Sequence, residues 1–256
     1  MMLIWRRYGL SILFFLLMIM GWQVSVTTLK VPFYILPSPL RIMEALIEKW
    51  SIFPRHIGMT LLETLLGLGI AIGLGILFAV WIHFSSFISK VLFPLLIASQ
   101  AIPLITISPV LNVWFGYSIW SKVTIVVIWT FFPITVTLVQ GLRSVDPALL
   151  DVLRTMRATR WQLFRMVEWP SSLPSLFAGL KMAALFSVVG ATVGEWLGSE
   201  YGLGVLTRRA SSSMQTDLLF AGSFVLMALG LLLFLGVKWW EHHVLFWKKS
   251  DQNLKE

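Results

Sequence analysis

Six apolar stretches, each about long enough to cross a lipid bilayer, constrain this chain more than any other feature. A hydrocarbon core of roughly 30 Å needs about 20 predominantly apolar residues per helix. Helices satisfy their own backbone hydrogen bonds there, and the alternating pattern of a membrane barrel is missing from this sequence. We therefore predict an all-α, polytopic membrane helix bundle in a single domain over residues 1–256, with about six transmembrane helices at Leu10–Val26, Ile57–Ile82, Leu92–Leu111, Val123–Leu142, Leu176–Leu197 and Leu218–Trp239.

Composition and missing motifs exclude several classes of function. Charged residues make up only 12% of the chain, against about 25% in a soluble domain. We expect the net charge of +8 at the membrane edges, on anionic lipid rather than on nucleic acid. The chain has no cysteine, no phosphate-binding G-x-x-x-x-G-K-[ST] loop, no H-E-x-x-H and no G-x-S-x-G. We predict no catalytic residue, no metal ligand and no cofactor-binding residue, and therefore not an enzyme.

The longest polar interruption in the second half of the chain is the segment Arg143–Pro174. By the positive-inside rule, a short loop this rich in arginine stays in the cytoplasm. Its arginines are Arg143, Arg154, Arg157, Arg160 and Arg165.

The same segment carries the start signals of two short helices. Asp146 followed by Pro147 predicts an N-cap and a first helical residue. Thr159, with Gln162 three residues later, predicts a capping box that starts a second helix. We expect the prolines at positions 170 and 174 to end that second helix. Two short basic helices on the cytoplasmic side favour a docking function.

Charge distribution predicts that both termini lie in the cytoplasm. With the N-terminus inside, twelve lysines and arginines fall on the cytoplasmic side and seven on the outer side. The outer residues are Lys30, Arg41, Lys49, Arg55, Lys122, Arg208 and Arg209.

Two acidic residues within spans are candidates for a translocation path, because ionisable groups inside a membrane are rare and usually functional. Glu63 lies near the start of the second span, where it could instead reach water or Arg55. Glu195 lies at the end of the fifth span, beside a glycine-rich turn, where Arg208 or Arg209 could cap it. Both interpretations stay open for each residue.

The third span is interrupted by prolines at positions 94, 103 and 109. Prolines are tolerated in a membrane helix where neighbouring helices or a polar cavity satisfy the freed carbonyls. We therefore expect Gln100, Pro103 and Ser108 to line a path. In the second span, the glycines at 67, 69, 73 and 75 favour close helix packing.

The segment Lys30–Arg55 is amphipathic. Ser38 and Pro39 can start a helix, whose apolar face would hold Ile42, Met43, Leu46, Ile47 and Trp50. This helix would either lie in the membrane interface or pack on the bundle as an ordinary connection.

The cytoplasmic segment resembles the EAA loop of permease subunits from bacterial ABC importers, whose pattern is roughly E-A-A-x-x-x-G followed by x9-I-x-L-P. The aligned run is Asp151–Arg157, followed by Trp169-Pro170 and Leu173-Pro174. Asp151 keeps the acid, whereas Val152 and Leu153 replace small residues. Arg157 stands where the family usually has the glycine that permits a left-handed turn.

The flanking sequence extends the resemblance over about residues 36–239. LPSPLRIMEAL, FPLLIASQAIPLITISPVLNVWFG and GEWLGSEYGLGVL are similar to the branch that handles nitrate, sulfonates, taurine and thiamine-precursor pyrimidines. SQAIP and GEWLG are most similar to permeases for hydroxymethylpyrimidine-type precursors of thiamine.

This resemblance implies a non-catalytic permease of the bacterial cell membrane, with ATP and Mg on separate ATPase subunits. It also implies a second permease copy, an extracytoplasmic binding protein that docks on Lys30–Arg55 and Ser199–Thr216, and surrounding membrane lipid. The ATPase-coupling residues would be Asp151, Arg154, Thr155, Arg157, Ala158, Thr159, Arg160, Trp161 and Phe164.

Three other interpretations compete with the importer. An ion-coupled secondary carrier commonly shows two related halves, and the sequence has no convincing internal repeat. A membrane-embedded enzyme could use Glu63 or Glu195 as an acid or base, but a second catalytic group is missing at any recognisable spacing. A scaffolding subunit would not need a broken span or acids within spans.

Overall fold

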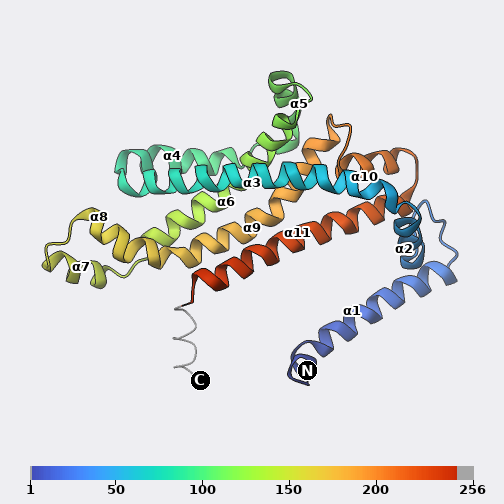
Figure 1. Ribbon diagram of the computed structural model, residues 1–256, viewed down its shortest axis with the longest axis horizontal. Helices are drawn as coiled ribbons and strands as arrows, with labels where there is room; N and C mark the ends of the chain where they lie inside the picture. Colours follow the sequence, from blue (N-terminus) through green and yellow to red (C-terminus); the bar gives the residue numbers. More distant parts are fainter. Residues whose placement is uncertain (1, 247–256) are drawn as a thin grey trace.

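The computed structural model describes residues 2–246 and shows an elongated bundle of helices (Figure 1). Five helical stretches in this part of the chain are long and apolar enough to span a membrane. They are α1 (Met2–Thr28), α3 (Phe53–Phe84), α6 (Ile119–Arg143), the continuous stretch that ends with α9 (Trp169–Trp196), and α11 (Thr216–Val244). The shorter helices are α2 (Pro39–Glu48), α4 (Ser86–Ser99), α5 (Leu104–Phe115), α7 (Pro147–Thr155), α8 (Arg160–Leu163) and α10 (Leu203–Ser212), with a 3-10 turn at Trp50–Ile52. The predicted helical membrane fold is confirmed.

The core of the bundle lies where α3, α6 and α9 cross, and small residues bring these helices together. At Gly75 an added Cβ would lie 2.8 Å from Ile134 Cγ2, and at Gly67 it would lie 2.5 Å from Val126 Cβ. The predicted packing role is therefore confirmed for these two glycines. Gly69 and Gly73 lie on another side of the same helix, where an added Cβ would meet nothing within 4 Å in the described part of the chain.

The third predicted span consists of two shorter helices, α4 and α5, separated at residues 100–103. Pro103 is the N-cap of α5 and has an extended backbone (φ −62°, ψ 117°). A proline disfavours helical geometry in the residue before it, so the chain breaks here. Pro94 and Pro109, in contrast, lie inside helices. Figure 1 shows α4 running back alongside α3 and α5 turning away from the bundle.

The prediction that prolines 170 and 174 end the second loop helix is wrong. Helix α8 continues through a π-helical turn, Phe164–Glu168, directly into α9. Trp169 N–H donates to the Phe164 carbonyl, five residues back. A π turn shifts the hydrogen-bond register by one residue, and the shift occurs just before Pro170, where a regular helix would lose a bond.

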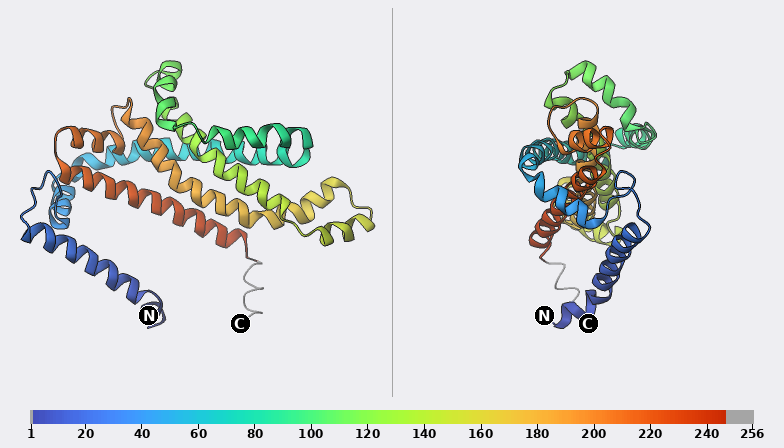
Figure 2. Two further views of the ribbon diagram at one scale, coloured as in Figure 1. Left: turned by 180° about the vertical axis from the view of Figure 1, so that it is seen from behind. Right: turned by 90° about the vertical axis from the view of Figure 1, so that its right-hand side faces the viewer.

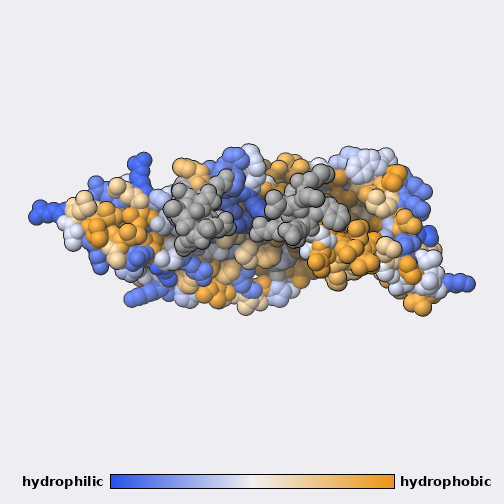
Figure 3. Space-filling model, turned by 90° about the horizontal axis from the view of Figure 1, so that it is seen from below, coloured by the Kyte–Doolittle hydropathy of each residue, from blue (hydrophilic) through white to orange (hydrophobic). Residues whose placement is uncertain are grey.

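The two ends of the bundle carry different loops. Helices α7 and α8 project at one end, which we call the cytoplasmic end after the topology predicted from charge, and α2 and α10 lie at the other, which we call the outer end (Figure 1). Helix α1 meets the rest of the chain near α2 and otherwise diverges from the bundle in both views of Figure 2. Figure 3 shows hydrophilic side chains projecting at both ends of the long axis, with hydrophobic side chains over much of the face between them. This distribution is that of a protein whose long axis crosses a membrane.

Candidate functional site

A buried polar cluster lies at the α10 end of the bundle. It begins with His56, Thr60, Glu63 and Thr64, which occupy one face of α3 at helical spacing and are all buried. Side chains at i, i+4 and i+7 share a helix face, so this polar stripe points into the bundle. The cluster is built at the level where α3, α9 and α10 meet.

Glu195, at the end of α9, is the centre of this cluster and is 1% exposed. The Thr60 hydroxyl donates to Glu195 Oε1 at 2.6 Å, and the Gly204 N–H donates to Oε2 at 2.5 Å. Gly202 packs against the same carboxylate with φ +137°, and a Cβ there would lie 2.2 Å from Glu195 Cδ. Glycine is required here both by its backbone conformation and by the close approach.

Further hydrogen bonds tie the turn before α10 to α3. Leu203 N–H donates to the Thr60 hydroxyl at 2.8 Å. His56 Nδ1 lies 2.7 Å from the Gly202 carbonyl oxygen and 3.0 Å from its nitrogen, so either tautomer of the ring can bond to this residue. The interpretation of Glu195 as capped by Arg208 or Arg209 does not match this geometry, because Arg208 donates to the Trp196 carbonyl.

Glu63 is completely buried, and neither of its carboxylate oxygens has a hydrogen-bond partner within residues 2–246. Glu195 and Lys122 are the charged groups close enough to act on it. The alternative contact with Arg55 is not formed: the Arg55 guanidinium lies 3.5 Å above the centre of the Tyr201 ring. The two acidic path candidates therefore lie in one site, with Lys122 close to both.

Lys122 is 1% exposed, although it begins a membrane-spanning helix. Its ammonium donates to the carbonyls of Tyr117 and Ser118, at 2.9 and 3.1 Å. Lys122 also borders a cavity of about 500 Å³, together with Tyr117 and residues 198–201. The polar cluster thus opens toward a hollow at the outer end of α6.

The break between α4 and α5 forms a second polar region, midway along the bundle. Gln100 and Pro103 line a cavity of about 190 Å³, and Gln100 also lines a neighbouring cavity of about 270 Å³. Trp129 of α6 borders both. Ser108 lies apart from these cavities, fully buried, and its hydroxyl has no partner within the described chain.

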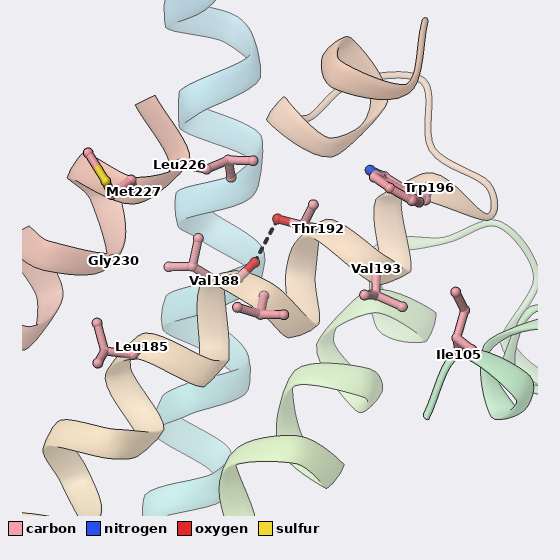
Figure 4. A pocket seen from close by; sticks show the side chains of 10 residues that line it. Ile105, Leu185, Val188, Thr192, Val193, Trp196, Leu226, Met227 and Gly230 are labelled. Atoms are coloured by element: carbon pink, nitrogen blue, oxygen red, sulfur yellow. Dashed lines mark hydrogen bonds between the residues drawn. The ribbon is translucent and has the colours of Figure 1, made fainter. Parts of the chain in front are cut away.

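A larger cavity of about 490 Å³ lies between α5, α9 and α11 (Figure 4). Its walls are almost wholly apolar, with Trp196, Leu226 and Ile105 among them. The Thr192 hydroxyl donates to the Val188 carbonyl of its own helix at 2.8 Å and so offers no free donor to a ligand. This cavity lacks the polar groups that would orient a substrate.

The predicted coupling residues lie at the opposite end, on α7 and α8. The Asp146 N-cap, which accepts from Ala148 N–H, and the Thr159–Gln162 capping box are both confirmed. Asp151 and Arg154 pair at 3.0 Å while remaining about two-thirds exposed, at 68% and 62%. Of the other predicted residues, Thr155, Arg157, Thr159, Arg160 and Trp161 are exposed and Ala158 is half-buried.

Arg157 adopts the left-handed turn that glycine would favour, with φ +59°. Ala158 N–H donates to the Leu153 carbonyl at 3.1 Å, and Arg157 N–H donates to the Arg154 carbonyl at 2.9 Å. These two bonds are those of a Schellman motif. The backbone turn between α7 and α8 is therefore kept although its glycine is replaced.

Phe164 is the exception among the coupling residues, since it is only 6% exposed. Its ring lies 5.0 Å from Phe84, 5.4 Å from Trp161 and 5.9 Å from Trp169 between centroids. Beside these rings, His83 Nε2 and Glu168 Oε2 are 2.8 Å apart. This aromatic cluster fixes the root of the loop to the end of α3.

Sequence reasoning missed several residues of both ends. The stripe His56–Thr60–Glu63 has the spacing of a buried helix face and could have been found as a polar pattern in an apolar span. On α7, Leu149, Val152 and Met156 are 54%, 59% and 73% exposed. An exposed apolar stripe of this kind indicates a surface that another protein or lipid covers.

The two segments predicted to receive a binding protein lie side by side at the outer end. Lys49 Nζ donates to Gln215 Oε1 at 2.7 Å, and the Thr216 hydroxyl donates to the Tyr34 carbonyl at 2.8 Å. Ile42 is buried against the α10 and α11 region, so α2 packs on the bundle. Of its predicted apolar face, Met43, Ile47 and Trp50 are instead exposed, because α2 turns Ala45 and Ile42 inward.

A helical membrane bundle with a polar break halfway along it and an exposed helical loop at one end is consistent in architecture with a membrane transport protein. The chain belongs to the family of binding-protein-dependent transport system inner membrane components, which matches residues 71–245. It is thus the membrane-spanning permease subunit of an ABC importer, a class that works with ATPase subunits and a substrate-binding protein.

Individual relatives give further detail. The chain is 42% identical to the formylaminopyrimidine transport permease protein ThiX of Halalkalibacterium halodurans, over 93% of this chain and 96% of that protein. It is 32% identical to the riboflavin transport system permease protein RibX of Chloroflexus aurantiacus, over 96% and 92%. The inward-facing MetNI methionine ABC transporter has the same fold, with a TM-score of 0.60 and 19% identity over 76% of this chain and 96% of that chain.

Proposed function

We propose that this permease imports a thiamine-precursor pyrimidine of the hydroxymethylpyrimidine type. The observation that carries the proposal is the 42% identity to a formylaminopyrimidine permease along nearly the whole of both chains. The likeness to a riboflavin permease points the same way, because both relatives' substrates contain a flat nitrogen heterocycle. A sulfonate, taurine or nitrate permease of the same type is the alternative.

In the proposed mechanism this chain contributes no catalytic residue. ATP and Mg bind to separate ATPase subunits, which seat α7 and α8 in a groove. The exposed Leu149, Val152 and Met156 give this contact its apolar part, and Asp151 and Arg154 give it charge. The helix that runs from α8 through the π turn into α9 supplies a rigid link from the ATPase to the bundle.

We further propose that two copies of the chain form the pore, with both termini in the cytoplasm. Each copy has one coupling loop, and an importer has two ATPase contacts to serve. Helix α1 supports this arrangement, because it is apolar over Gly9–Thr28, largely exposed and separate from the bundle, so that lipid or a second copy must cover it. The binding protein would dock on Lys30–Arg55 and Ser199–Thr216, at the other end from the coupling loop.

The proposed path runs from the Glu63–Glu195 cluster to the break at Gln100 and Pro103. Both regions place polar groups within an otherwise apolar bundle. Ser108 on α5, the helix that follows the break, adds a buried hydroxyl.

The test is ATP hydrolysis by the complete complex in nanodiscs, with the candidate ATPase and binding protein. Asp151→Lys reverses a charge on the coupling surface, and we expect it to remove the stimulation of hydrolysis by the binding protein. Lys90→Glu, an exposed charge reversal on α4 outside the proposed coupling and docking segments, is the matched control. Uptake of pyrimidines is then compared with uptake of sulfonates. Absence of any ATPase response would favour an ion-coupled carrier, and uptake of sulfonates alone would overturn the pyrimidine assignment.

A further inference from the structure

The two cavities at the α4–α5 break are lined by both an amide side chain and aromatic rings. Gln100 and Trp129 border both, so the cavities adjoin across these two side chains. Ser99 and Ile107 also line the smaller cavity, and aromatic rings line part of the larger one. Those rings belong to Phe132 and Phe186.

We propose that these two cavities form a binding site for a neutral, amino-substituted pyrimidine on its way through the permease. This inference rests on the proposed function and adds to it a site within this chain. The break places the site midway along the bundle, since Trp129 lies near the centre of α6 and Phe186 near the centre of α9.

The Gln100 amide supplies the polar recognition. It offers two donors and one acceptor, and within residues 2–246 the side chain has no hydrogen-bond partner. An amide of this kind pairs with adenine through its donor and its acceptor at once, to a ring nitrogen and to the exocyclic amino group. A 4-aminopyrimidine also presents an amino donor and a ring-nitrogen acceptor along one edge. Gln100 therefore matches one edge of that ring.

The aromatic residues supply the flat surfaces. Trp129 borders both cavities, and Phe132 and Phe186 border the larger one. Flat heterocycles stack on such rings irrespective of their substituents. The volumes, about 190 and 270 Å³, are below the roughly 300 Å³ at which pockets for drug-sized ligands begin. A single substituted ring suits this size.

The lining also discriminates against the alternative substrates. No lysine, arginine, aspartate or glutamate is among the described residues that line either cavity. A sulfonate or nitrate brought here would give up part of its hydration to largely apolar walls without gaining a counter-charge, which is unfavourable for an ion. A neutral heterocycle loses much less hydration free energy in the same position. The site therefore favours the pyrimidine branch over the anion branch.

The test measures binding to the permease itself, because the binding protein imposes its own selectivity. The permease–ATPase complex in nanodiscs, without binding protein, is titrated with 4-aminopyrimidine and with 4-methylpyrimidine by saturation-transfer NMR. We expect the amino compound to bind the wild type about fivefold more tightly, since one net hydrogen bond contributes about 1 kcal/mol and 1.4 kcal/mol is tenfold. Gln100→Leu should abolish this preference and leave the weak binding of 4-methylpyrimidine unchanged.

Two further variants keep the result interpretable. Gln140→Leu changes an exposed glutamine at the far end of α6 and should leave the preference intact. Gln100→Met keeps the length of the side chain but removes both the amide donors and the acceptor, so it should also lose the preference if Gln100→Leu does not fold. No binding of either compound to the wild type, or an equal loss of both in Gln100→Leu, overturns the site. Uptake and ATP hydrolysis by the complete complex test the proposed function separately.

Discussion

The two ends of the bundle hold their loops by different physical means. At the outer end, the turn before α10 is attached to α3 and α9 through buried hydrogen bonds to Thr60 and Glu195. At the cytoplasmic end, the loop is attached through stacked aromatic rings around Phe164 and a half-buried pair of His83 and Glu168. Directional bonds in a dry environment tolerate little displacement, whereas aromatic packing tolerates sliding. The outer end is built to be rigid, and the cytoplasmic end is built to move as a unit.

The largest expected effect is at the outer end, at Gly202. In Gly202→Ala the new Cβ meets the Glu195 carboxyl at 2.2 Å, and φ is +137°. Overpacking and backbone strain each cost about 1–3 kcal/mol, so we expect a loss of about 3–5 kcal/mol in the free energy of unfolding, measured by thermal unfolding in nanodiscs. Gly69→Ala is the control. It faces open space and should stabilise α3 by about 0.5–1 kcal/mol. Equal stability of the two variants would contradict a rigid outer end.

Thr60→Val tests the hydrogen bonds of the same end without changing volume. It leaves the buried Leu203 N–H unpaired and removes the donor to Glu195. An orphaned buried group costs about 1–3 kcal/mol, so we expect a loss of about 2 kcal/mol. Thr64→Val is a matched control one turn along the helix, because its hydroxyl has no partner among the described residues. It should be neutral or stabilising. Similar losses in both variants would mean that the hydrogen bonds carry little of the effect.

Phe164→Leu tests the cytoplasmic end. The smaller side chain loosens the contacts to Phe84 and Trp161, and conservative apolar changes usually cost below about 1.5 kcal/mol. We expect the bundle to stay folded while the stimulation of ATP hydrolysis by the binding protein falls severalfold. Phe87→Leu, at a ring that is 77% exposed, should change neither quantity. Full stimulation of ATP hydrolysis in Phe164→Leu would mean that the aromatic cluster does not contribute to coupling.

The difference between the two ends also explains what could be predicted from sequence. The third predicted span is instead two shorter helices. The other five spans and the caps at Asp146 and Thr159 depend on patterns within a few residues, so they were predicted correctly. The outer cluster was not, because Thr60 and Glu195 are 135 positions apart and only the folded bundle brings them together. The role of each acid was accordingly left open between two interpretations.

The errors have equally specific causes. Pro170 carries the usual signal for a helix end, but the π turn before it absorbs the missing hydrogen bond. A π turn has no sequence signature as regular as a cap. Among the glycines of α3, small size alone did not show which faced α6, since that depends on the rotation of the helix within the bundle.

The smallest expected effect concerns Arg157, where the substitution should stabilise the structure rather than destabilise it. A left-handed conformation costs a residue other than glycine about 1 kcal/mol, and Arg157 adopts it at φ +59°. Arg157→Gly should therefore stabilise the turn by about 1 kcal/mol, seen as severalfold slower hydrogen exchange at Ala158, whose N–H closes the Schellman motif. Arg154→Gly, inside α7, should instead speed exchange, because glycine costs about 1 kcal/mol in a helix.

The same variant shows why an arginine stands at this position. If exchange slows and stimulated ATP hydrolysis is unchanged, the side chain serves neither the turn nor the ATPase contact. If exchange slows and hydrolysis weakens, the guanidinium contributes to the contact at a cost in local stability. Faster exchange in Arg157→Gly would contradict the strain argument itself. The second result is the one we expect, since the Arg157 side chain is exposed on the surface that we propose the ATPase covers and its charge does not contribute to the turn.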